Sequence, residues 1–288
     1  MAKNILNVGG FSIIKRIGTG ARSTIYMATD GQDKTKVALK RVIFERPEDS
    51  RIFEQVETEY KVSRRIDHPY VRKCYTLKKI RSMFKVKEML LSMELFEART
   101  LEDSPTLSLL DVLLVFRMVA SGLDAMHREG FVHCDIKPNN ILLSKSGSIK
   151  IIDLGQSCKI GTIKQRIQGT PDYIAPEQVK RRPLGPKTDI FNLGATMYWA
   201  LTGQNIPTLI PKKDSLGLPI LQQQMAPHEI RKQLPVGISK LVMDCVEEDS
   251  SKRPRNMVTV ISRLDMMVHS ILGGNLKSEK LKTKNAKT

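Results

Sequence analysis

The sequence predicts an α+β fold, with a small strand-rich part first and a larger, mainly helical part after it. Two observations carry this prediction. Residues 11–18, 23–29 and 36–43 are alternating or β-branched runs separated by glycine and aspartate turns, which indicate short antiparallel strands. Beyond residue 96, apolar side chains recur at helical spacing instead.

The individual elements follow from the same patterns. One helix, over residues 50–66, interrupts the strands, which resume near residues 73–77 and 88–94. Ser108 is placed to cap a helix that ends before Gly130 and whose apolar face comprises Val112, Phe116, Val119, Leu123 and Met126. A second apolar helix is expected over residues 188–201, and a last one over residues 257–271 that stops at Gly273 and Gly274.

Composition limits the classes of protein. The 288 residues are 41% hydrophobic and 27% charged, which is ordinary for a soluble globular chain of one large domain or two subdomains. The longest apolar stretches are shorter than the roughly 20 residues of a membrane span, and residues 1–10 lack the pattern of a secretory signal. The four cysteines are scattered without paired spacing, which argues against disulfides or zinc and predicts a cytoplasmic location.

The formal charge is +17, with ten basic residues between positions 61 and 87 and five between positions 277 and 287. Two interpretations remain open. The charge is either a solvated basic surface or the attraction site of an anionic partner such as nucleic acid, an acidic protein or lipid head groups.

Two segments of the strand-rich part suit phosphate chemistry. Residues 17–25 (Ile-Gly-Thr-Gly-Ala-Arg-Ser-Thr-Ile) hold small residues between two strands, so backbone N–H groups could approach phosphates. Lys40 ends the apolar strand segment Val-Ala-Leu-Lys, and a buried ammonium needs anions around it. Glu59, on the following helix, offers a carboxylate.

The most specific segment is His-Cys-Asp-Ile-Lys-Pro-Asn-Asn at residues 133–140, followed by an apolar strand. Residues 149–155 (Ile-Lys-Ile-Ile-Asp-Leu-Gly) then form a second apolar strand that ends in an acid and a glycine. These segments resemble the catalytic and metal-binding loops of the eukaryotic-type (Hanks-type) serine/threonine protein kinases. The resemblance runs from about residue 11 to residue 271. It implies a bilobal kinase-like fold, with an antiparallel β-sheet N-lobe holding one helix and a larger helical C-lobe.

Roles are implied by this resemblance, residue by residue. Asp135 would be the catalytic base, Lys137 would steady the γ-phosphate, and Asn140 and Asp153 would bind magnesium, with manganese as a possible substitute. Lys40 would contact the α- and β-phosphates of ATP, with Glu59 as its ion-pair partner. The nucleotide would further contact Ile17, Gly18, Gly20, Ile25, Ala38, the gatekeeper Met93, the hinge residues Glu94 and Phe96, and Leu142.

Other matches concern the protein substrate and the frame of the site. Residues 169–177 resemble the substrate-docking end of an activation segment, with Thr170 facing the catalytic residues and Glu177 pairing with Arg253. Asp189 resembles the buried acid that anchors the catalytic loop. Lys137 and Thr170 are typical of the serine/threonine class, and the segment 152–179 has the style of bacterial members. Protein substrates with Ser or Thr hydroxyls are therefore expected.

The sequence departs from the family in a few places. Ser23 replaces the third glycine of the phosphate loop, and Leu154 replaces a common phenylalanine. Ser63 stands where an apolar residue usually links the helix to the core, which predicts a weaker link. Cys134 replaces an arginine that reads activation-loop phosphate, so phosphorylation of that loop is not expected to be the main switch. Cys134 is either a small neutral filler or a redox-sensitive thiol.

The resulting division is an N-terminal extension (1–10), an N-lobe (11–95), a C-lobe (96–272) and a disordered basic tail (273–288). An active kinase is the leading hypothesis. The alternatives are a pseudokinase that binds nucleotide as a signalling scaffold, and a small-molecule phosphotransferase. The phosphotransferase is disfavoured because it would not be expected to carry the Glu177 segment paired with Arg253. Specific nucleic-acid binding is not expected, because only the charge suggests it.

Overall fold

The structure is a computed structural model that describes residues 7–20, 22–46, 49–82, 84–104, 106–210 and 224–284, with side chains described as far as residue 273. The chain forms two compact units. The first comprises Met1–Ala98 and Lys150–Ser157, and the second comprises Arg99–Ile149 and Cys158–Thr288. The first is built on a β-sheet and the second mainly on helices, which confirms the predicted α+β class. The predicted lobe boundaries stay a proposal.

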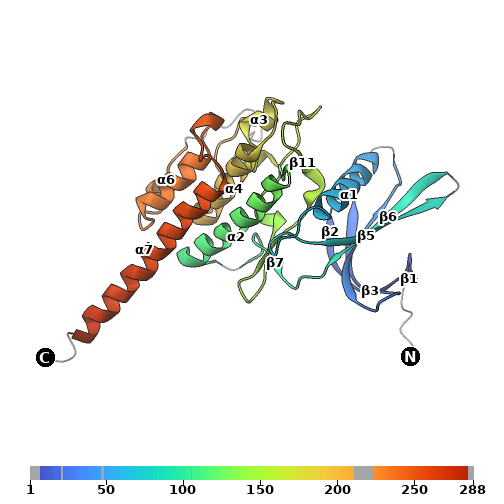
Figure 1. Ribbon diagram of the computed structural model, residues 1–288, viewed down its shortest axis with the longest axis horizontal. Coiled ribbons are helices and arrows are strands. Elements are labelled where there is room, and N and C mark those ends of the chain that lie inside the picture. Colours follow the sequence, from blue (N-terminus) through green and yellow to red (C-terminus); the bar gives the residue numbers. More distant parts are fainter. Residues whose placement is uncertain are drawn as a thin grey trace, which may run out of the picture. The chain divides into compact units, whose positions relative to one another are not determined.

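The first unit is an antiparallel sheet with one long helix, α1 (Ser50–Ser63), packed against it (Figure 1). The strands lie in the order β1-β2-β3-β4-β6-β5. Their bounds are β1 Asn7–Val8, β2 Phe11–Gly20, β3 Ser23–Asp30, β4 Lys36–Ile43, β5 Cys74–Ser82 and β6 Lys85–Glu94. Thus residues 7 and 8, which the sequence assigned to an extension, add a short edge strand to the sheet.

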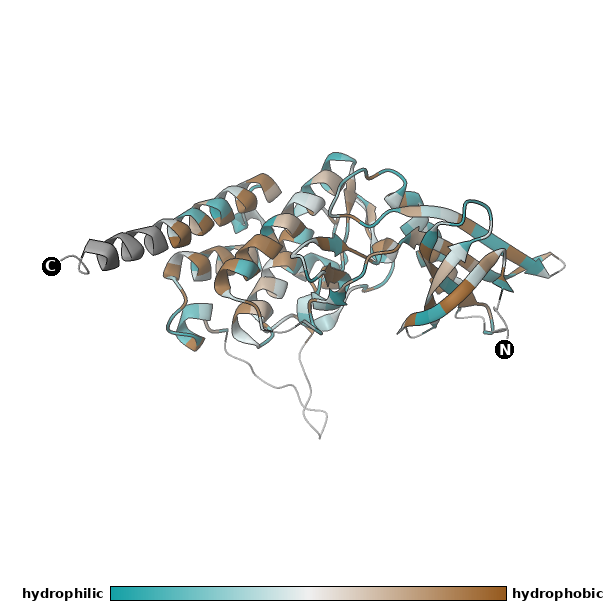
Figure 2. Cartoon of the chain, turned by 90° about the horizontal axis from the view of Figure 1, so that it is seen from below, coloured by the Kyte–Doolittle hydropathy of each residue, from teal (hydrophilic) through white to brown (hydrophobic). Residues whose placement is uncertain are grey.

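Alternation along β4 gives the sheet its two faces. Val37 and Leu39 pack into the cluster on one face, whereas Ala38 and Val42 pack into the cluster that also holds Phe53 of α1. Successive side chains of a strand point to opposite faces, so Lys40 shares the α1 face with Ala38 and Val42. Figure 2 shows the corresponding hydrophobic and hydrophilic bands on the strands.

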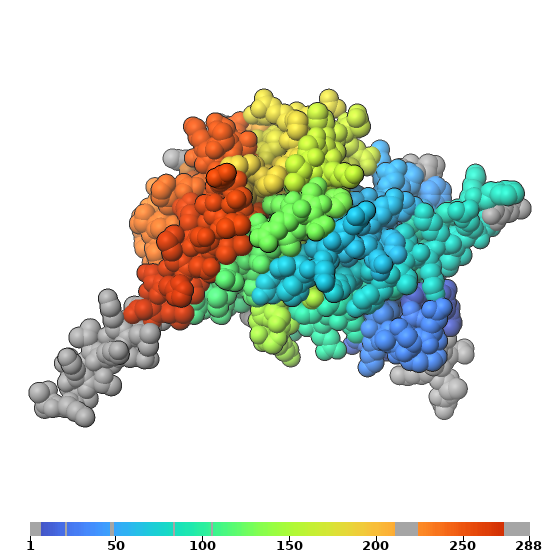
Figure 3. All heavy atoms as spheres, viewed as in Figure 1, coloured from blue at the N-terminus to red at the C-terminus, as the bar shows by residue number. Residues whose placement is uncertain are grey.

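The second unit is organised around α2 (Leu109–Arg128) and α4 (Pro186–Thr202), with α7 (Met257–Lys284) lying beside α2 (Figure 3). Its shorter elements are β7 Arg99–Thr100, β8 Phe131–Val132, η2 Pro138–Asn140, β9 Ile141–Leu143, β11 Cys158–Lys159, η4 Pro171–Tyr173, α3 Pro176–Val179, α5 Pro227–Ile230, α6 Val236–Cys245 and η5 Ser250–Lys252. β10 (Ile149–Ile151) leads back into the first unit, where η3 (Leu154–Gln156) packs against α1. Among the described helices, none is long and apolar enough to cross a bilayer.

The ends of α2 and α4 follow from their sequences. The Ser108 side chain accepts a hydrogen bond from the Asp111 amide and so caps α2 as predicted. Gly130, just beyond that helix, has φ +80°, and Gly203 closes α4 with φ +76°. Both positions need a left-handed backbone, which glycine adopts without steric cost. The predicted apolar face of α2 is buried throughout.

The predicted end of the last helix is wrong. The sequence placed it at Gly273 and Gly274, but α7 continues to Lys284. A glycine inside a helix costs only about 1 kcal/mol relative to alanine, and the residues that follow include several good helix formers. The glycine pair is therefore too weak a signal to stop a helix alone. Of the predicted tail at residues 273–288, only residues 285–288 lie outside the described backbone.

Candidate active site

The first unit brings together three predicted site residues, Lys40, Glu59 and Asp153. Lys40 projects from the α1 face of β4, and its Nζ donates to Glu59 Oε2 at 2.7 Å. The same Nζ lies 3.7 Å from Asp153 Oδ1. Burial by itself would lower the pKa of Lys40, but Glu59 and Asp153 outweigh it and hold that pKa above its ordinary value. The ammonium therefore stays charged.

Two further polar residues hold Glu59 and its helix in place. Arg72, which follows α1, is buried and puts Nη2 3.7 Å from the other carboxylate oxygen of Glu59. Ser63 Oγ donates to the Arg72 carbonyl at 2.9 Å and accepts from the Cys74 amide at 2.8 Å. The sequence predicted a weak link at Ser63. The structure corrects this, because two buried hydrogen bonds join the end of α1 to Arg72 and to Cys74, the first residue of β5.

The backbone around Asp153 is shaped by close packing against α1. Asp153 has φ +61°, a left-handed conformation that aspartate tolerates better than most residues. Gly155 follows two residues later, and a Cβ there would lie 3.0 Å from the Gln55 side chain and 3.2 Å from the Gln55 carbonyl. A larger residue would press against Gln55, so glycine suits this close approach. The Asp153 side chain stays 45% exposed beside Lys40, so its carboxylate is accessible to a cation.

In the second unit, Asp135 lies at the centre of another cluster. Its Oδ1 accepts from the Thr170 hydroxyl at 2.8 Å and from the Thr170 amide at 3.1 Å. Lys137 Nζ lies 3.1 Å from Asp135 Oδ2 and donates to the Thr170 hydroxyl at 2.7 Å. Asn140 Nδ2 donates to the Asp135 carbonyl at 2.8 Å. One hydroxyl is thus held between a carboxylate and an ammonium group.

The predicted ligands suit magnesium in their chemistry. Asn140 uses its amide nitrogen on Asp135, which leaves the amide oxygen as the donor to a cation. Asp153 offers a carboxylate. Among the described residues no cluster of three or more His, Cys, Asp or Glu side chains could hold a metal ion alone. Nucleotide phosphates and water would have to complete the shell, as is usual for magnesium.

Asp189 anchors the backbone of His133 and Cys134, the two residues that precede Asp135 in the sequence. Fully buried in α4, it accepts from the Cys134 amide at 2.8 Å, the His133 amide at 2.9 Å and His127 Nε2 at 2.8 Å. Burial by itself raises the pKa of Asp189, but the hydrogen bond and charge of His127, with the Cys134 amide, outweigh it and hold that pKa below its ordinary value.

Replacing Asp189 by asparagine is expected to lower the unfolding free energy by about 2–3 kcal/mol at neutral pH, since a buried amide NH₂ would face backbone donors. The pKa in the folded state is lowered. The stabilisation by Asp189 is therefore fully present above the unfolded pKa of about 3.9 and is lost as pH falls through the lower folded value. Urea unfolding of both proteins at neutral and acidic pH measures this. A difference that stays constant as pH falls below about 4 would contradict the assignment.

The predicted pair of Glu177 and Arg253 is present. Arg253 donates to both Glu177 oxygens, at 2.8 and 3.0 Å, and its side chain is fully buried. The same guanidinium donates to the carbonyls of Lys187, Glu247 and Glu248. A planar, five-donor group is required for such a set of contacts. Arg253 thereby connects Glu177 in α3 to Lys187 in α4 and to residues 247 and 248, which follow α6.

Most of the predicted nucleotide contacts lie in the first unit. Ile17, Gly18 and Gly20 are on β2, Ile25 is on β3, and Met93 and Glu94 end β6, with Phe96 two residues beyond. Ala38 and the buried gatekeeper Met93 are direct cross-strand partners. The Glu94 amide donates to the Lys73 carbonyl, and its carboxylate pairs with Lys150 at 2.7 Å. Leu142 lies on β9 of the second unit.

Some residues of this frame were not predicted. Gln178 is buried, donates to the Cys134 carbonyl at 2.8 Å and accepts from the Ala175 amide at 2.9 Å. His127 completes the Asp189 set, and Arg72 supplements the Glu59 pair. The local sequence does not mark these three residues as part of the site, since each contacts the site through a partner outside its own element: the Cys134 carbonyl for Gln178, Asp189 for His127 and Glu59 for Arg72. Their burial is what marks them as part of the site, and the burial of a polar residue can be seen only once the fold is known.

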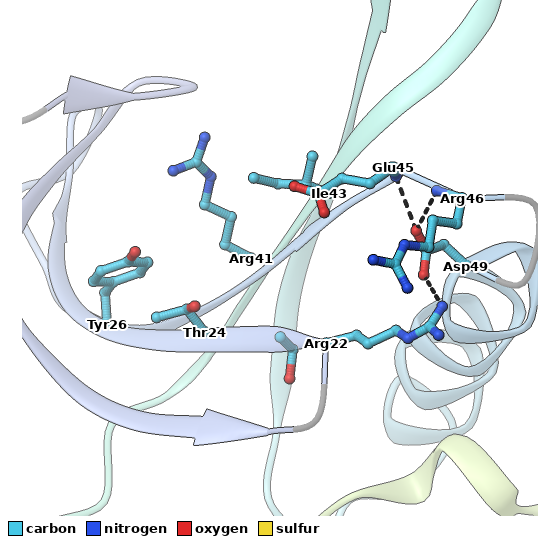
Figure 4. Close-up of a pocket in the computed structure, with 9 residues that line it drawn as sticks. Arg22, Thr24, Tyr26, Arg41, Ile43, Glu45, Arg46 and Asp49 are labelled. Atoms are coloured by element: carbon cyan, nitrogen blue, oxygen red, sulfur yellow. Dashed lines mark hydrogen bonds and ion pairs between the residues drawn. The ribbon is translucent and has the colours of Figure 1, made fainter.

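A separate hollow of about 390 Å³ lies on the first unit beside the β2–β3 turn (Figure 4). Arg22, Arg41 and Arg46 line it, and none of the predicted nucleotide-binding residues does. Arg22 is paired with Asp49, and Arg41 Nε lies 2.6 Å from Glu88. Two of the three guanidinium charges are thus already neutralised. This hollow is distinct from the predicted site and is a poor trap for an anion.

The fold and these clusters define the protein kinase class, and residues 11–263 match the protein kinase domain family, to which the chain therefore belongs. Among its relatives, the serine/threonine-protein kinases PknD of Chlamydia abortus and of Chlamydia caviae are 26% identical over 277 residues and 27% identical over 281 residues. The serine/threonine-protein kinase CST20 of Candida albicans is 30% identical over 246 residues.

These matches cover most of this chain but only part of each relative. They span 84%, 86% and 83% of the chain, but 29%, 30% and 19% of the respective relatives. The predicted family is confirmed. The two chlamydial relatives also agree with the bacterial style of residues 152–179.

Proposed function

We propose that the chain transfers the γ-phosphoryl group of ATP, as its magnesium complex, to serine and threonine hydroxyls of protein substrates. The observation that carries this proposal is the hydroxyl of Thr170, held between the Asp135 carboxylate and the Lys137 ammonium. A substrate hydroxyl in that setting would meet a proton acceptor and a cation that neutralises developing charge. The names of the relatives support the same substrate class.

The remaining residues take supporting roles in this proposal. Lys40, held by Glu59, would position the α- and β-phosphates, and Asn140 and Asp153 would hold the metal ion. Bound magnesium would neutralise charge on the phosphates during transfer. Phosphoryl transfer requires the protein mainly to position the reactants and to neutralise charge, and the residues for both tasks are present.

An assay of turnover separates this function from a pseudokinase scaffold. The chain is incubated with ATP, magnesium and a serine-containing peptide, and ADP release is compared with the same peptide carrying alanine. We expect ADP release that requires both magnesium and the serine. Nucleotide binding, detected as a thermal shift, without any such turnover would favour the scaffold.

Phosphorylation of the activation segment is not proposed as the main switch. Cys134 stands where a phosphate-reading arginine would be, and a buried thiol cannot pair with phosphate. Thr162→Ala should therefore leave the rate of phosphoryl transfer within about tenfold of wild type. A phosphate on Thr162 has no arginine at position 134 to pair with, so little is lost when it cannot be added. The backbone bonds of Thr162 to Lys159 and Leu184 are kept in this variant. A hundredfold loss in a folded variant would refute this prediction.

We also propose an anionic partner for the basic surface and a cytoplasmic location. On the β5–β6 hairpin, Arg81, Lys85 and Lys87 are exposed, and Phe84 beside them is 96% exposed. The cations would attract an anionic partner, and the exposed Phe84 ring would offer it an apolar contact. Binding to anionic vesicles or RNA that disappears at high salt would show that charge alone is responsible.

Four free cysteines support the proposed cytoplasmic location, since disulfides are rare in a reducing compartment.

A further inference from the structure

Two of the four cysteines lie in contact next to the proposed catalytic base. Cys134 Sγ and Cys158 Sγ are 3.7 Å apart. The contact arises because β11 pairs with β8, with Cys158 opposite Val132, two residues before Cys134. The two sulfurs share a small apolar cluster with Val132 and Leu184. The sequence left open whether Cys134 is a filler or a redox-sensitive thiol, because it could not show this neighbour.

The two thiols differ in accessibility and in acidity. Cys134 is buried, whereas Cys158 is half-buried. The hydrogen bond shared with Cys134, helped by the charge of Lys164, lowers the pKa of the Cys158 thiol. The same hydrogen bond and burial raise the pKa of the Cys134 thiol. Cys158 is therefore the more accessible and more nucleophilic sulfur, and Cys134 is placed behind it.

From this juxtaposition we propose that Cys134 and Cys158 form a peroxide-responsive pair that oxidises to an intramolecular disulfide. The Cys158 thiolate attacks one oxygen of a hydroperoxide. The O–O bond breaks, an S–O bond forms, and the released oxygen takes a proton and leaves as water or an alcohol. Cys134 then attacks the sulfenic sulfur, so that the S–O bond breaks, the S–S bond forms and water leaves with the Cys134 proton. Two electrons pass from the two sulfurs to the peroxide.

The bond requires only a small movement. A disulfide has sulfurs about 2.05 Å apart, so the two atoms must approach by roughly 1.6 Å. β11 is a two-residue strand, which limits the structure that must shift. At Cys134, however, the backbone is firmly held, since its amide donates to Asp189 and its carbonyl accepts from Gln178. Closing the bond pulls on the residue that directly precedes Asp135.

The other two cysteines supply an internal control. Cys74 and Cys245 are both buried, and burial raises the pKa of each thiol to about 12. In the described residues neither has a second cysteine sulfur in contact. Peroxide should therefore leave both as thiols, which makes the predicted modification specific to one pair among four free cysteines.

The test treats the full chain with graded hydrogen peroxide, alkylates the remaining thiols and maps the peptides by mass spectrometry. We expect a peptide linking Cys134 to Cys158, reversed by dithiothreitol, while Cys74 and Cys245 stay alkylated. In Cys158→Ser no link should form. In Cys134→Ala, Cys158 should accumulate as sulfenic acid or over-oxidised forms instead. Equal oxidation of all four cysteines, or oxidation of Cys158 in wild type without the link, would overturn the proposal.

The consequence for catalysis rests on the proposed function and is measured separately. The oxidised chain should phosphorylate a serine peptide at least several-fold more slowly and recover with dithiothreitol, whereas Cys158→Ser should keep its rate in peroxide. If the link forms in a chain that shows no transfer even when reduced, the proposed function fails while the disulfide stands. If the reduced chain is active and no link forms, only the disulfide fails.

Discussion

Replacing Asp135 by asparagine is expected to slow phosphoryl transfer to a serine peptide by about 10²–10⁴-fold, the usual contribution of a general base. Asparagine keeps the size of the side chain but cannot accept the proton of the substrate hydroxyl. It also presents an NH₂ group where Asp135 accepts hydrogen bonds from Thr170 and lies 3.1 Å from Lys137. Steady-state rates at saturating ATP measure the effect.

The control is nucleotide binding. Asp135 contacts Thr170, Lys137 and Asn140, and none of these is proposed to bind the adenine. The variant should therefore show the same thermal shift with ADP as wild type. A folded Asp135→Asn protein that transfers phosphate within a few-fold of the wild-type rate would refute the assignment of the base.

Replacing Arg253 by alanine is expected to lower the unfolding free energy by about 3–5 kcal/mol, the range found when one partner of a buried ion pair is removed. The substitution leaves the Glu177 carboxylate without its bidentate partner. It also deprives the carbonyls of Lys187, Glu247 and Glu248 of a donor. Urea unfolding followed by circular dichroism gives the free energy.

Arg253→Lys is the matched control. Lysine keeps the charge but not the planar fork that reaches both Glu177 oxygens and the surrounding carbonyls at once. We expect an intermediate loss for this variant. Equal stability of Arg253→Ala and wild type would mean that the pair contributes nothing to the fold of the second unit.

Regular patterns in the sequence predicted most of the fold. Alternation placed Lys40 on a strand and helical spacing placed Glu59 on a helix, and the structure joins the two at 2.7 Å. The cap at Ser108 was also predicted, because N-cap chemistry is local. Each of these signals depends on neighbours within a few residues along the chain.

Contacts between distant residues were beyond such patterns. The link at Ser63 was predicted to be weak because a serine replaces the usual apolar residue, and its hydrogen-bond partners, the Arg72 carbonyl and the Cys74 amide, could not be read from the sequence around Ser63. The contact between Cys134 and Cys158 depends on the pairing of two strands of two residues each, which carry no periodicity. The predicted end of α7 was wrong because the helix formers beyond Gly273 outweigh the cost of a glycine inside a helix.

The proposed function of this chain is the phosphorylation of serine and threonine residues of proteins. Its most direct test is incubation of the chain with ATP, magnesium and a degenerate peptide library that contains serine, threonine and tyrosine, followed by mass-spectrometric mapping of every phosphorylated residue. We predict phosphate on serine and threonine and none on tyrosine. A library that stays unmodified while the chain binds ATP, or phosphate confined to tyrosine, would contradict this function.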